Sequence, residues 1–399
     1  MTVTVIGVSA AQPLSPEAAG VLRAAEFVVG SPDNLALADV GDDVERLELG
    51  PLAPALERLR AADRPAAVVA SGDPGLFGIA RVLRESGIDI RVLPAVSSVA
   101  AAFARIGLPW DDAVVVSAHG RDLAPALNAC RAFERVAVLT APGKGAVELA
   151  RGLHGWERAL VVAERLGLSG ERITRRPAAE IATLDADAFD APHVVLCLAP
   201  GGASTMRRDN QPAAAPAAGW ALPEDAYAHR DSMITKAEVR AYAVARLRPR
   251  LGRLVLDVGA GSGSVGIECA ALGAAVMSVE RDVDACRLIA ENAARHGVQI
   301  RVVEGSAPGA LDDLPDPDAA FVGGGGPDVV RGVVHRRVRT VVAAFATLDT
   351  AIAAHRLLTG AGYHVEGTQL SAARLSQLPT GSLRLAAINP VVVLTAELA

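Results

Sequence analysis

The chain of 399 residues is poor in aromatic residues and has no excess of basic charge. Aromatic side chains make up 3% of it, too few for the stacking platforms that bind single-stranded nucleic acid. The 39 basic and 45 acidic residues give a formal net charge of −6, so no strong basic field is present to hold a phosphate backbone. We therefore expect no nucleic-acid partner.

Cysteine is also scarce, and the four cysteines lie far apart: Cys130, Cys197, Cys269 and Cys286. No pair has the CxxC spacing of a zinc knuckle, and four scattered thiols are too few for a disulfide framework. We interpret them as small buried apolar residues of a protein in a reducing compartment. The sequence predicts no metal site.

Long apolar runs are missing as well. The longest uncharged apolar stretches, such as residues 92–104, fall short of the roughly 18–20 residues that a membrane span needs. The first residues, MTVTVIGV, form a strand-like run without the basic leader of a signal peptide. We expect a cytoplasmic protein with no membrane partner.

Short apolar runs alternate with helical segments along both halves of the chain. In the first half we expect strands at residues 3–8, 66–70, 90–93, 113–117, 136–140, 160–163 and 194–198. In the second half we expect them at residues 254–258, 275–279, 300–303, 319–322, 338–343, 364–369 and 391–396. Continuous Val, Leu and Ala runs indicate strands covered on both faces, and the alternation predicts two α/β domains in tandem.

One stretch without hydrophobic periodicity separates the two halves. Residues 201–219 read GGASTMRRDNQPAAAPAAG, a composition typical of a semi-stiff linker. We predict a first domain over residues 1–205, a linker over 206–219 and a second domain over 220–399.

The sharpest local chemistry follows the first strand of the second half. Asp257 lies at the end of that strand, and a glycine-rich turn at 259–263 leads into a helix that begins near Ser264. Glycine lets a backbone turn tightly and approach a ligand, and the free N–H groups of a helix start suit a negative or polar group. The next strand ends in Glu280, whose carboxylate can accept hydrogen bonds from both hydroxyls of a ribose.

Two kinds of cofactor fit this pattern. Residues 261–266 satisfy GxGxxG, the fingerprint of dinucleotide-binding domains, and Glu280 has the spacing expected for it. Two features favour S-adenosylmethionine instead: Asp257 stands two residues before the first glycine, and the loop 305–308 after the third strand is placed to frame an adenine. A glycine-rich turn without a ligand is the third interpretation.

Several segments of the second half, in order and at these intervals, resemble the decarboxylating precorrin methyltransferase domain of cobalamin biosynthesis. They are ITKAEVR (234–240), DVGAGSGSVGIE, SVERD, EGSAPGAL and FVGGGG (321–326). The resemblance implies a Rossmann-like class I methyltransferase fold with S-adenosylmethionine as cofactor. The residues implied at the cofactor are Thr235, Asp257, Gly259, Ala260, Gly261, Ser262, Gly263, Glu280, Ser306 and Ala307. The family usually has Asp at the position of Ser306, and an Asn where this chain reads AAFATL (343–348).

Segments of the first half resemble the tetrapyrrole methylase fold. They are VIGV (5–8), VVGSPDNL (28–35), ASGDPGLFGIARVL (70–83), residues 93–121, VAVLTAPG (136–143) and AERLGLSGERI (163–173). The ligand positions that this resemblance implies are Ser71, Gly72, Asp73, Ser97, Ser98 and Thr140. In its first loop the family tends to have Gly-x-Gly and then Asp-Gly, whereas residues 7–12 of this chain read GVSAAQ.

The two resemblances in this order imply a decarboxylating C(5,15)-methyltransferase of the precorrin family. Its substrate would be precorrin-6B, methylated at carbons 5 and 15 and decarboxylated at the ring C acetate to give precorrin-8. No general acid or base is assigned, because the macrocycle itself supplies much of the activation. A second interpretation leaves catalysis to the second domain alone, with the first as a docking scaffold, and a third is a binding protein without turnover. We expect self-association.

One basic cluster and two histidines have no assigned role. The cluster, Arg331, His335, Arg336, Arg337 and Arg339, is either a clamp for substrate carboxylates or a solvated helix end. A lone histidine is more often structural than catalytic, and we assign no function to His119 or His229.

Overall fold

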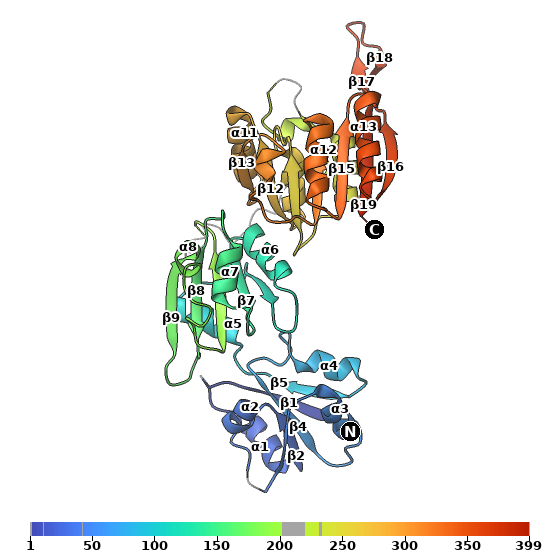
Figure 1. The fold of residues 1–399 in the computed structure, drawn as a ribbon. Coiled ribbons are helices and arrows are strands. Elements are labelled where there is room, and N and C mark those ends of the chain that lie inside the picture. Colours follow the sequence, from blue (N-terminus) through green and yellow to red (C-terminus); the bar gives the residue numbers. More distant parts are fainter. Residues whose placement is uncertain (1, 11, 42, 202–219, 231–233, 399) are drawn as a thin grey trace. The chain divides into compact units, whose positions relative to one another are not determined.

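The computed structural model describes residues 2–10, 12–41, 43–201, 220–230 and 234–398 (Figure 1). The chain forms two compact units. The first combines residues 1–121, 137–151 and 158–205, and the second combines residues 122–136, 152–157 and 206–399. The predicted linker, residues 206–219, lies outside the described residues.

A five-stranded parallel sheet forms the start of the chain. Its order is β3 (Glu45–Glu48), β2 (Phe27–Gly30), β4 (Ala66–Ser71), β1 (Val3–Val8) and β5 (Ile90–Leu93). The helices between these strands are α1 (Pro16–Ala24), α2 (Pro32–Leu37), α3 (Leu52–Arg60) and α4 (Ile79–Glu85). Successive residues of β1 enter different apolar clusters, with Val3 and Val5 in one and Ile6 and Val8 in the other. Both faces of the sheet are therefore covered, as the continuous apolar runs predict.

A second five-stranded sheet follows. Its order is β6 (Val114–Ser117), β7 (Arg135–Leu139), β10 (His193–Leu198), β8 (Ala159–Glu164) and β9 (Arg172–Pro177). Strand β8 pairs antiparallel with both β10 and β9. The helices in this part are α5 (Ser98–Ile106), α6 (Ala124–Ala132), α7 (Ala146–Gly152) and α8 (Ala178–Ile181). The apolar side of α5 packs on this sheet, where Val99 and Phe103 meet Ala137, Val161 and Leu196.

The second unit is built on a seven-stranded sheet. Its order is β13 (Arg301–Glu304), β12 (Ala275–Glu280), β11 (Leu254–Val258), β14 (Ala319–Val322), β15 (Thr340–Phe345), β19 (Val391–Leu398) and β16 (Tyr363–Leu370). The first five strands are parallel, and β19 runs antiparallel to both of its neighbours. The chain order reverses at β11, so a ligand site is expected at the carboxyl ends of β11 and β14.

Helices and a hairpin complete this unit. The helices are α9 (Ala237–Leu247), α10 (Ser264–Ala271), α11 (Val283–Arg295), α12 (Gly326–His335) and α13 (Leu348–Gly360), with short turns η1 (Glu224–Ala226) and η2 (Gly309–Leu311). The strands β17 (Ala373–Gln377) and β18 (Leu383–Ala387) pair only with each other and project from the sheet (Figure 1).

The predicted fold class is confirmed, and every predicted strand is present with ends shifted by at most two residues. All four cysteines are buried and none forms a disulfide, as expected. Five strands were not predicted: β2, β3, β9, β17 and β18. Strand β2 has only four residues, and β3 and β9 are polar edge strands, so neither has the apolar run that marks a central strand. Within the described residues, no helix is long and apolar enough to cross a membrane.

Candidate active sites

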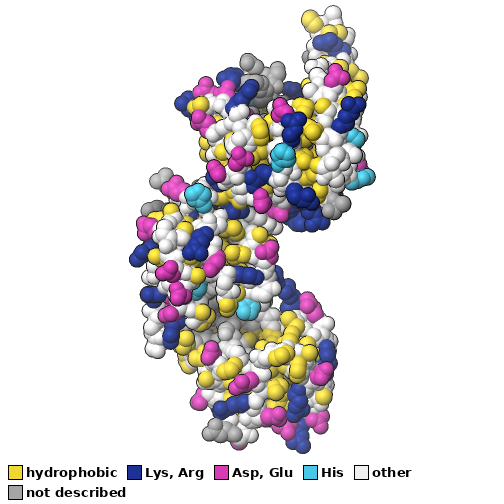
Figure 2. Space-filling view, in the orientation of Figure 1, with side chains coloured by type: hydrophobic (Ala, Val, Ile, Leu, Met, Phe, Trp, Pro, Cys, Tyr) yellow, Lys and Arg dark blue, Asp and Glu magenta, His cyan; other side chains and the backbone are white. Residues whose placement is uncertain are grey.

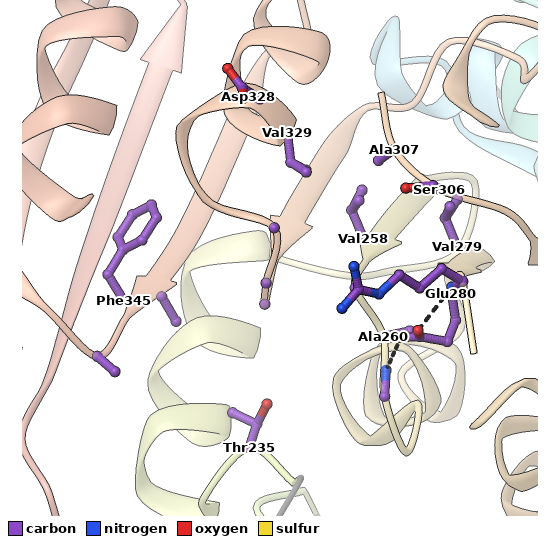
Figure 3. A pocket seen from close by; sticks show the side chains of 18 of the residues that line it. Thr235, Val258, Ala260, Val279, Glu280, Ser306, Ala307, Asp328, Val329 and Phe345 are labelled. Atoms are coloured by element: carbon purple, nitrogen blue, oxygen red, sulfur yellow. Dashed lines mark hydrogen bonds between the residues drawn. The ribbon is translucent and has the colours of Figure 1, made fainter. Parts of the chain in front are cut away.

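A cavity of about 740 Å³ lies at the carboxyl ends of the central strands of the second unit (Figure 3). Its floor is the turn after β11, where Gly259, Ala260 and Gly261 line the cavity. Glu280 at the end of β12 and the loop 305–308 after β13 form one wall. The strand order places these three loops side by side, which is the arrangement predicted for a nucleotide-type site.

Backbone conformation explains the glycines of this turn. Gly259 has φ +68°, Gly261 +57° and Gly263 +76°, a region that L residues with a side chain rarely adopt. A Cβ on Gly259 would lie 3.1 Å from the backbone nitrogen of Gly324, so this glycine also lets the turns after β11 and β14 pass close together. Gly263 then caps α10, and the start of that helix directly follows the turn.

Glu280 is tied to the same turn by its side chain. One carboxylate oxygen accepts a hydrogen bond from Gly261 N at 2.9 Å, and the other accepts from Arg281 N at 2.8 Å and Asp282 N at 3.0 Å. These bonds hold the carboxylate at the cavity wall (Figure 3), and a carboxylate has acceptor capacity left for further donors.

Asp257 lies beneath the turn and does not line the cavity. Its side chain is fully buried; one oxygen accepts from Gly266 N at 2.9 Å, and the other has no partner within the described part of the chain. Burial raises the pKa of this carboxyl to about 7, with a smaller contribution from the charge of Glu280. Asp257 therefore holds the first turn of α10 in place.

Of the remaining predicted positions of this site, three line the cavity and two do not. Thr235, Ser306 and Ala307 line the cavity. Ser262 and Gly263 do not, and the carbonyl of Ser262 accepts a hydrogen bond from the buried Asn292 side chain.

Apart from Thr235, the residues of the wall opposite Glu280 were not predicted as site residues. These residues come from the turn after β14, the start of α12, the end of β15, the start of β19, and α9 with the segment before it. They are Ile234, Lys236, Val239, Gly323, Gly324, Gly325, Asp328, Val329, Ala344, Phe345, Ala346 and Val391. The glycine run 323–326 was a visible signal, because a run of glycines after a buried strand marks a close backbone approach.

Among the described residues that line this cavity, none belongs to the basic cluster at the end of α12. Arg331 forms an exposed ion pair with Asp328 at 2.6 Å. Arg336 donates to the carbonyls of Leu311 and Leu314 and pairs with Asp316. These contacts favour the helix-end interpretation over a substrate clamp.

A second cavity, of about 380 Å³, lies within the first unit. All six positions expected there line it: Ser71, Gly72, Asp73, Ser97, Ser98 and Thr140. It also receives His119, Arg165 and His193, which no sequence motif connects. Arg165 follows β8 and His193 begins β10, so the antiparallel pairing of these strands brings them together.

The loops at this second cavity are fixed by short polar contacts. Ser97 caps α5, its hydroxyl accepting from Ala100 N at 3.1 Å. Asp73 accepts from Gly75 N at 2.8 Å. A Cβ on Gly72, where φ is +61°, would lie 3.0 Å from the Ser97 Cα, so a glycine here lets the two loops touch.

The first loop departs from the family pattern and yet contributes to the cavity. Val8, Ser9 and Ala10 line it. A Cβ on Gly7 would lie 2.1 Å from the carbonyl oxygen of Gly72, so this glycine is required by the packing of β1 against the turn after β4.

Comparison with known proteins matches the two halves of the chain to two different family models. Residues 2–182 match the family described as Tetrapyrrole (Corrin/Porphyrin) Methylases, and residues 225–393 match the Precorrin methyltransferase domain. A Mycobacterium tuberculosis protein named precorrin-6Y C(5,15)-methyltransferase [decarboxylating] is 36% identical over 331 residues, 80% of this chain and 79% of the relative.

The chain belongs to the precorrin-6Y C(5,15)-methyltransferase (decarboxylating) family.

Two further relatives show how the match is distributed. A Sinorhizobium protein of the same name is 39% identical over 274 residues, which cover 66% of this chain and 63% of that protein. A Pyrobaculum calidifontis protein named probable cobalt-precorrin-6B C(15)-methyltransferase (decarboxylating) is 37% identical over 185 residues, 44% of this chain but 94% of the relative.

Membership of this precorrin methyltransferase family makes the chain an enzyme of methyl transfer. Such a reaction requires a methyl donor and a position for it, and the two cavities are the places where the expected ligand residues converge. Among the described residues there is no cluster of three His, Cys, Asp or Glu side chains arranged to hold a metal ion.

Proposed function

We propose that the enzyme converts precorrin-6B to precorrin-8, with S-adenosylmethionine as the methyl donor for carbons 5 and 15 and with loss of the ring C acetate carboxyl as carbon dioxide. The observation that carries this proposal is the pair of cavities, one in each unit, each lined by ligand positions that its own half of the sequence indicated.

The residues of the larger cavity suit S-adenosylmethionine. The sulfonium of S-adenosylmethionine supplies an electrophilic methyl group. The glycine turn 259–261 offers a backbone surface without side chains, and the carboxylate of Glu280 stands where two ribose hydroxyls can donate to it. Ser306 and Ala307 provide the wall for the adenine ring. The protein then acts by alignment and by exclusion of water rather than by supplying a general base.

The smaller cavity is proposed as the second methylation site. Asp73 and the start of α5 at Ser97 offer polar groups to a cofactor. Arg165 also lines this cavity, and its buried Nε has no partner in the described residues. A guanidinium in that position suits a carboxylate of the tetrapyrrole. Two transfers to different carbons need two geometries of attack, which two cavities can provide.

The direct test of this function is a mass measurement on the product. Purified protein incubated with S-adenosylmethionine and precorrin-6B should yield a product that has gained two methyl groups and lost one carboxyl as carbon dioxide. A product with two methyl groups and all carboxyls would contradict the proposed decarboxylation.

Calorimetry tests the cofactor site separately. Gly261→Val should abolish S-adenosylmethionine binding in the second unit, because φ +57° disfavours a branched residue and its side chain would occupy the cavity floor. Glu280→Ala should weaken binding by roughly 1.5–3 kcal/mol, the range for hydrogen bonds to a charged group. Saturable binding of NAD in place of S-adenosylmethionine would contradict the assignment.

We further propose that the protein is a homo-oligomer. The hairpin β17–β18 carries Leu375 opposite Leu385, with Leu383 two residues away on the same face. Their exposures are 71%, 67% and 66%, and Figure 2 shows hydrophobic side chains on this arm. A two-stranded hairpin is marginal alone, so a covering surface is needed, and the same leucine face of a second copy would match it.

Domain limits and location complete the proposal. We propose domains over residues 1–205 and 220–399 joined by the linker 206–219, which limited proteolysis should cleave first. Four buried cysteines without a disulfide suit a reducing compartment, which supports a cytoplasmic location.

A further inference from the structure

The segment before α9 forms one wall of the larger cavity, and Thr235 is the polar residue that it contributes besides Lys236. Among its described residues, 220–230 and 234–236, the single turn η1 is the one regular element. Something outside the segment must therefore fix where Thr235 stands.

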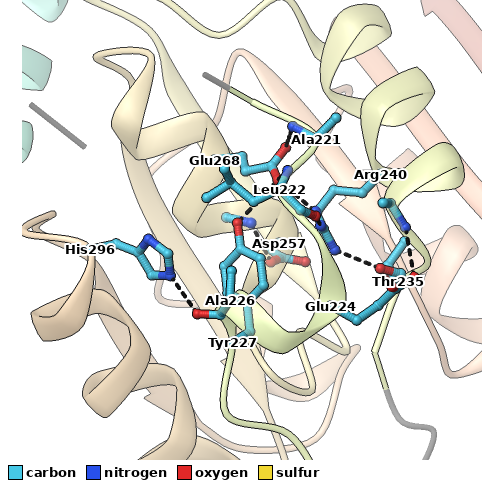
Figure 4. Close-up of polar contacts among 12 residues, drawn as sticks. Ala221, Leu222, Glu224, Ala226, Tyr227, Thr235, Arg240, Asp257, Glu268 and His296 are labelled. Atoms are coloured by element: carbon cyan, nitrogen blue, oxygen red, sulfur yellow. Dashed lines mark hydrogen bonds and ion pairs between the residues drawn. The ribbon is translucent and has the colours of Figure 1, made fainter. Parts of the chain in front are cut away.

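Arg240 does this from one turn inside α9. Its guanidinium is completely buried, and its Nη1 donates to the carbonyl of Thr235 at 2.7 Å (Figure 4). Nη2 donates to the carbonyl of Leu222, and Nε donates to Glu268 at 2.7 Å. Helical side chains point back toward the helix start, which is why residue 240 reaches residue 235.

Glu268 connects this arginine to the glycine turn. It lies on α10, the helix that begins at the turn, and is 2% exposed. Its carboxylate also accepts from Ala221 N at 2.9 Å, Leu222 N at 3.1 Å and the Tyr227 hydroxyl at 3.1 Å. Its charge is thus matched by Arg240 of α9, and its other three hydrogen bonds join residues 221, 222 and 227 to α10.

The arrangement is rigid for a physical reason. A buried ion pair is tolerated only with good geometry and satisfied donors, and neither residue is among those with an unpartnered buried atom in the described chain. A planar fork of donors fixes its acceptors in direction as well as in distance, which an ammonium group cannot do.

We propose that Arg240, oriented by Glu268, is a positioning residue for the cofactor. It fixes the position of Thr235 relative to the glycine turn on the other side of the cavity. Arg240 itself does not line the cavity. This inference rests on the proposed binding of S-adenosylmethionine at this site.

The test compares two arginine substitutions in the full chain. Arg240→Lys keeps the charge beside Glu268 but cannot hold three acceptors in one plane. Arg131→Lys is the matched control: Arg131 is also buried and donates to the Gly152 carbonyl at 2.7 Å, but it lies on α6, which lines neither cavity. Calorimetry, fitted with two sites, gives the S-adenosylmethionine dissociation constant at the larger cavity, and thermal unfolding gives the stability of each variant.

We expect both variants to unfold at lower temperature, but only Arg240→Lys to raise the dissociation constant, by at least tenfold. In turnover the same variant should raise KM for S-adenosylmethionine with kcat at saturation nearly unchanged. Equal affinities of Arg240→Lys and wild type would overturn the inference, as would an equal loss in both variants. If wild type itself does not bind, the proposed cofactor site fails instead.

A second variant applies if Arg240→Lys does not fold. Glu268→Gln keeps the volume and an acceptor for Nε while removing the charge that orients the guanidinium. We expect a several-fold weaker affinity with cooperative unfolding retained, and an unchanged affinity overturns the inference.

Discussion

Some residues support the cofactor cavity without lining it. Asp257 is the clearest case: the sequence placed it at the cofactor, and the structure places its carboxyl under the turn, bonded to Gly266 N. The hydroxyl of the neighbouring Ser278 is buried without a partner in the described residues. Its Oγ and the bonded Oδ2 of Asp257 each lie 3.0 Å from the position of a Cβ on Gly266. That glycine therefore leaves room for the carboxyl.

The raised pKa of Asp257 predicts how stability depends on pH. Its folded-state pKa is about 7 against an ordinary value of 3.8, so the folded protein binds the proton more tightly than the unfolded chain. The stability from the protonated carboxyl is fully present below pH 4 and is lost as the pH rises to about 7. Each pKa unit corresponds to about 1.4 kcal/mol.

Asp257→Asn should remove this dependence, because the amide stays neutral and can still accept from Gly266 N. We expect the variant to unfold at a higher temperature than wild type at pH 8 and to lose that advantage at pH 4. Parallel melting curves of the two proteins from pH 4 to pH 8 would contradict the account.

At the scale of elements, the hairpin β17–β18 is joined to the wall of the cofactor cavity. Arg374 on β17 forms paired hydrogen bonds with Glu224 of η1 and with Glu238 in the first turn of α9, all between 2.8 and 2.9 Å. The bond to Arg374 lowers the pKa of Glu224 to about 2. The hairpin therefore anchors the outer side of the segment that Arg240 anchors from within.

Arg374→Gln should destabilise the protein only modestly, by about 1 kcal/mol, because the arginine is partly exposed and solvent screens the pair. The lowered pKa of Glu224 means that this contribution is present above about pH 4.5 and falls away as the pH drops toward 2. Urea unfolding at pH 7 and at pH 4 should show the difference shrinking, and a constant difference would argue against the ion pair.

The leucine face of the hairpin makes a separate prediction. Leu385→Lys should dissociate the proposed oligomer, whereas Ser376→Lys, whose side chain lies on the opposite face of the hairpin, should not. Light scattering after size exclusion gives the mass of each. A monomeric wild type, or an oligomer that survives Leu385→Lys, would exclude this face as the interface.

The sequence predicts the central elements well and the peripheral ones poorly. Buried strands such as β11 and β12 are continuous apolar runs, so their pattern is visible without a structure. The polar edge strand β9 has no such pattern. The same limit applies to the sites: the glycine turn is local in sequence, but Arg240 and Glu268 are joined by a contact 28 residues apart that no spacing rule reveals.

At the scale of the whole molecule, the enzyme combines two α/β units that each carry a cavity. A curated relative named as a C(15)-methyltransferase is covered to 94% by less than half of this chain. We expect the second unit to carry the decarboxylation and the methylation of carbon 15, and the first unit to methylate carbon 5.

The measurement that tests this division most directly counts methyl groups by mass in the product of the full-length Asp73→Ala variant, beside wild type and an Asp111→Ala control at an exposed site away from both cavities. Wild type and the control should add two methyl groups and release one carbon dioxide. Asp73→Ala should release carbon dioxide but add only one methyl group. Two methyl groups from Asp73→Ala, or a single one from wild type, would contradict the account of two catalytic units.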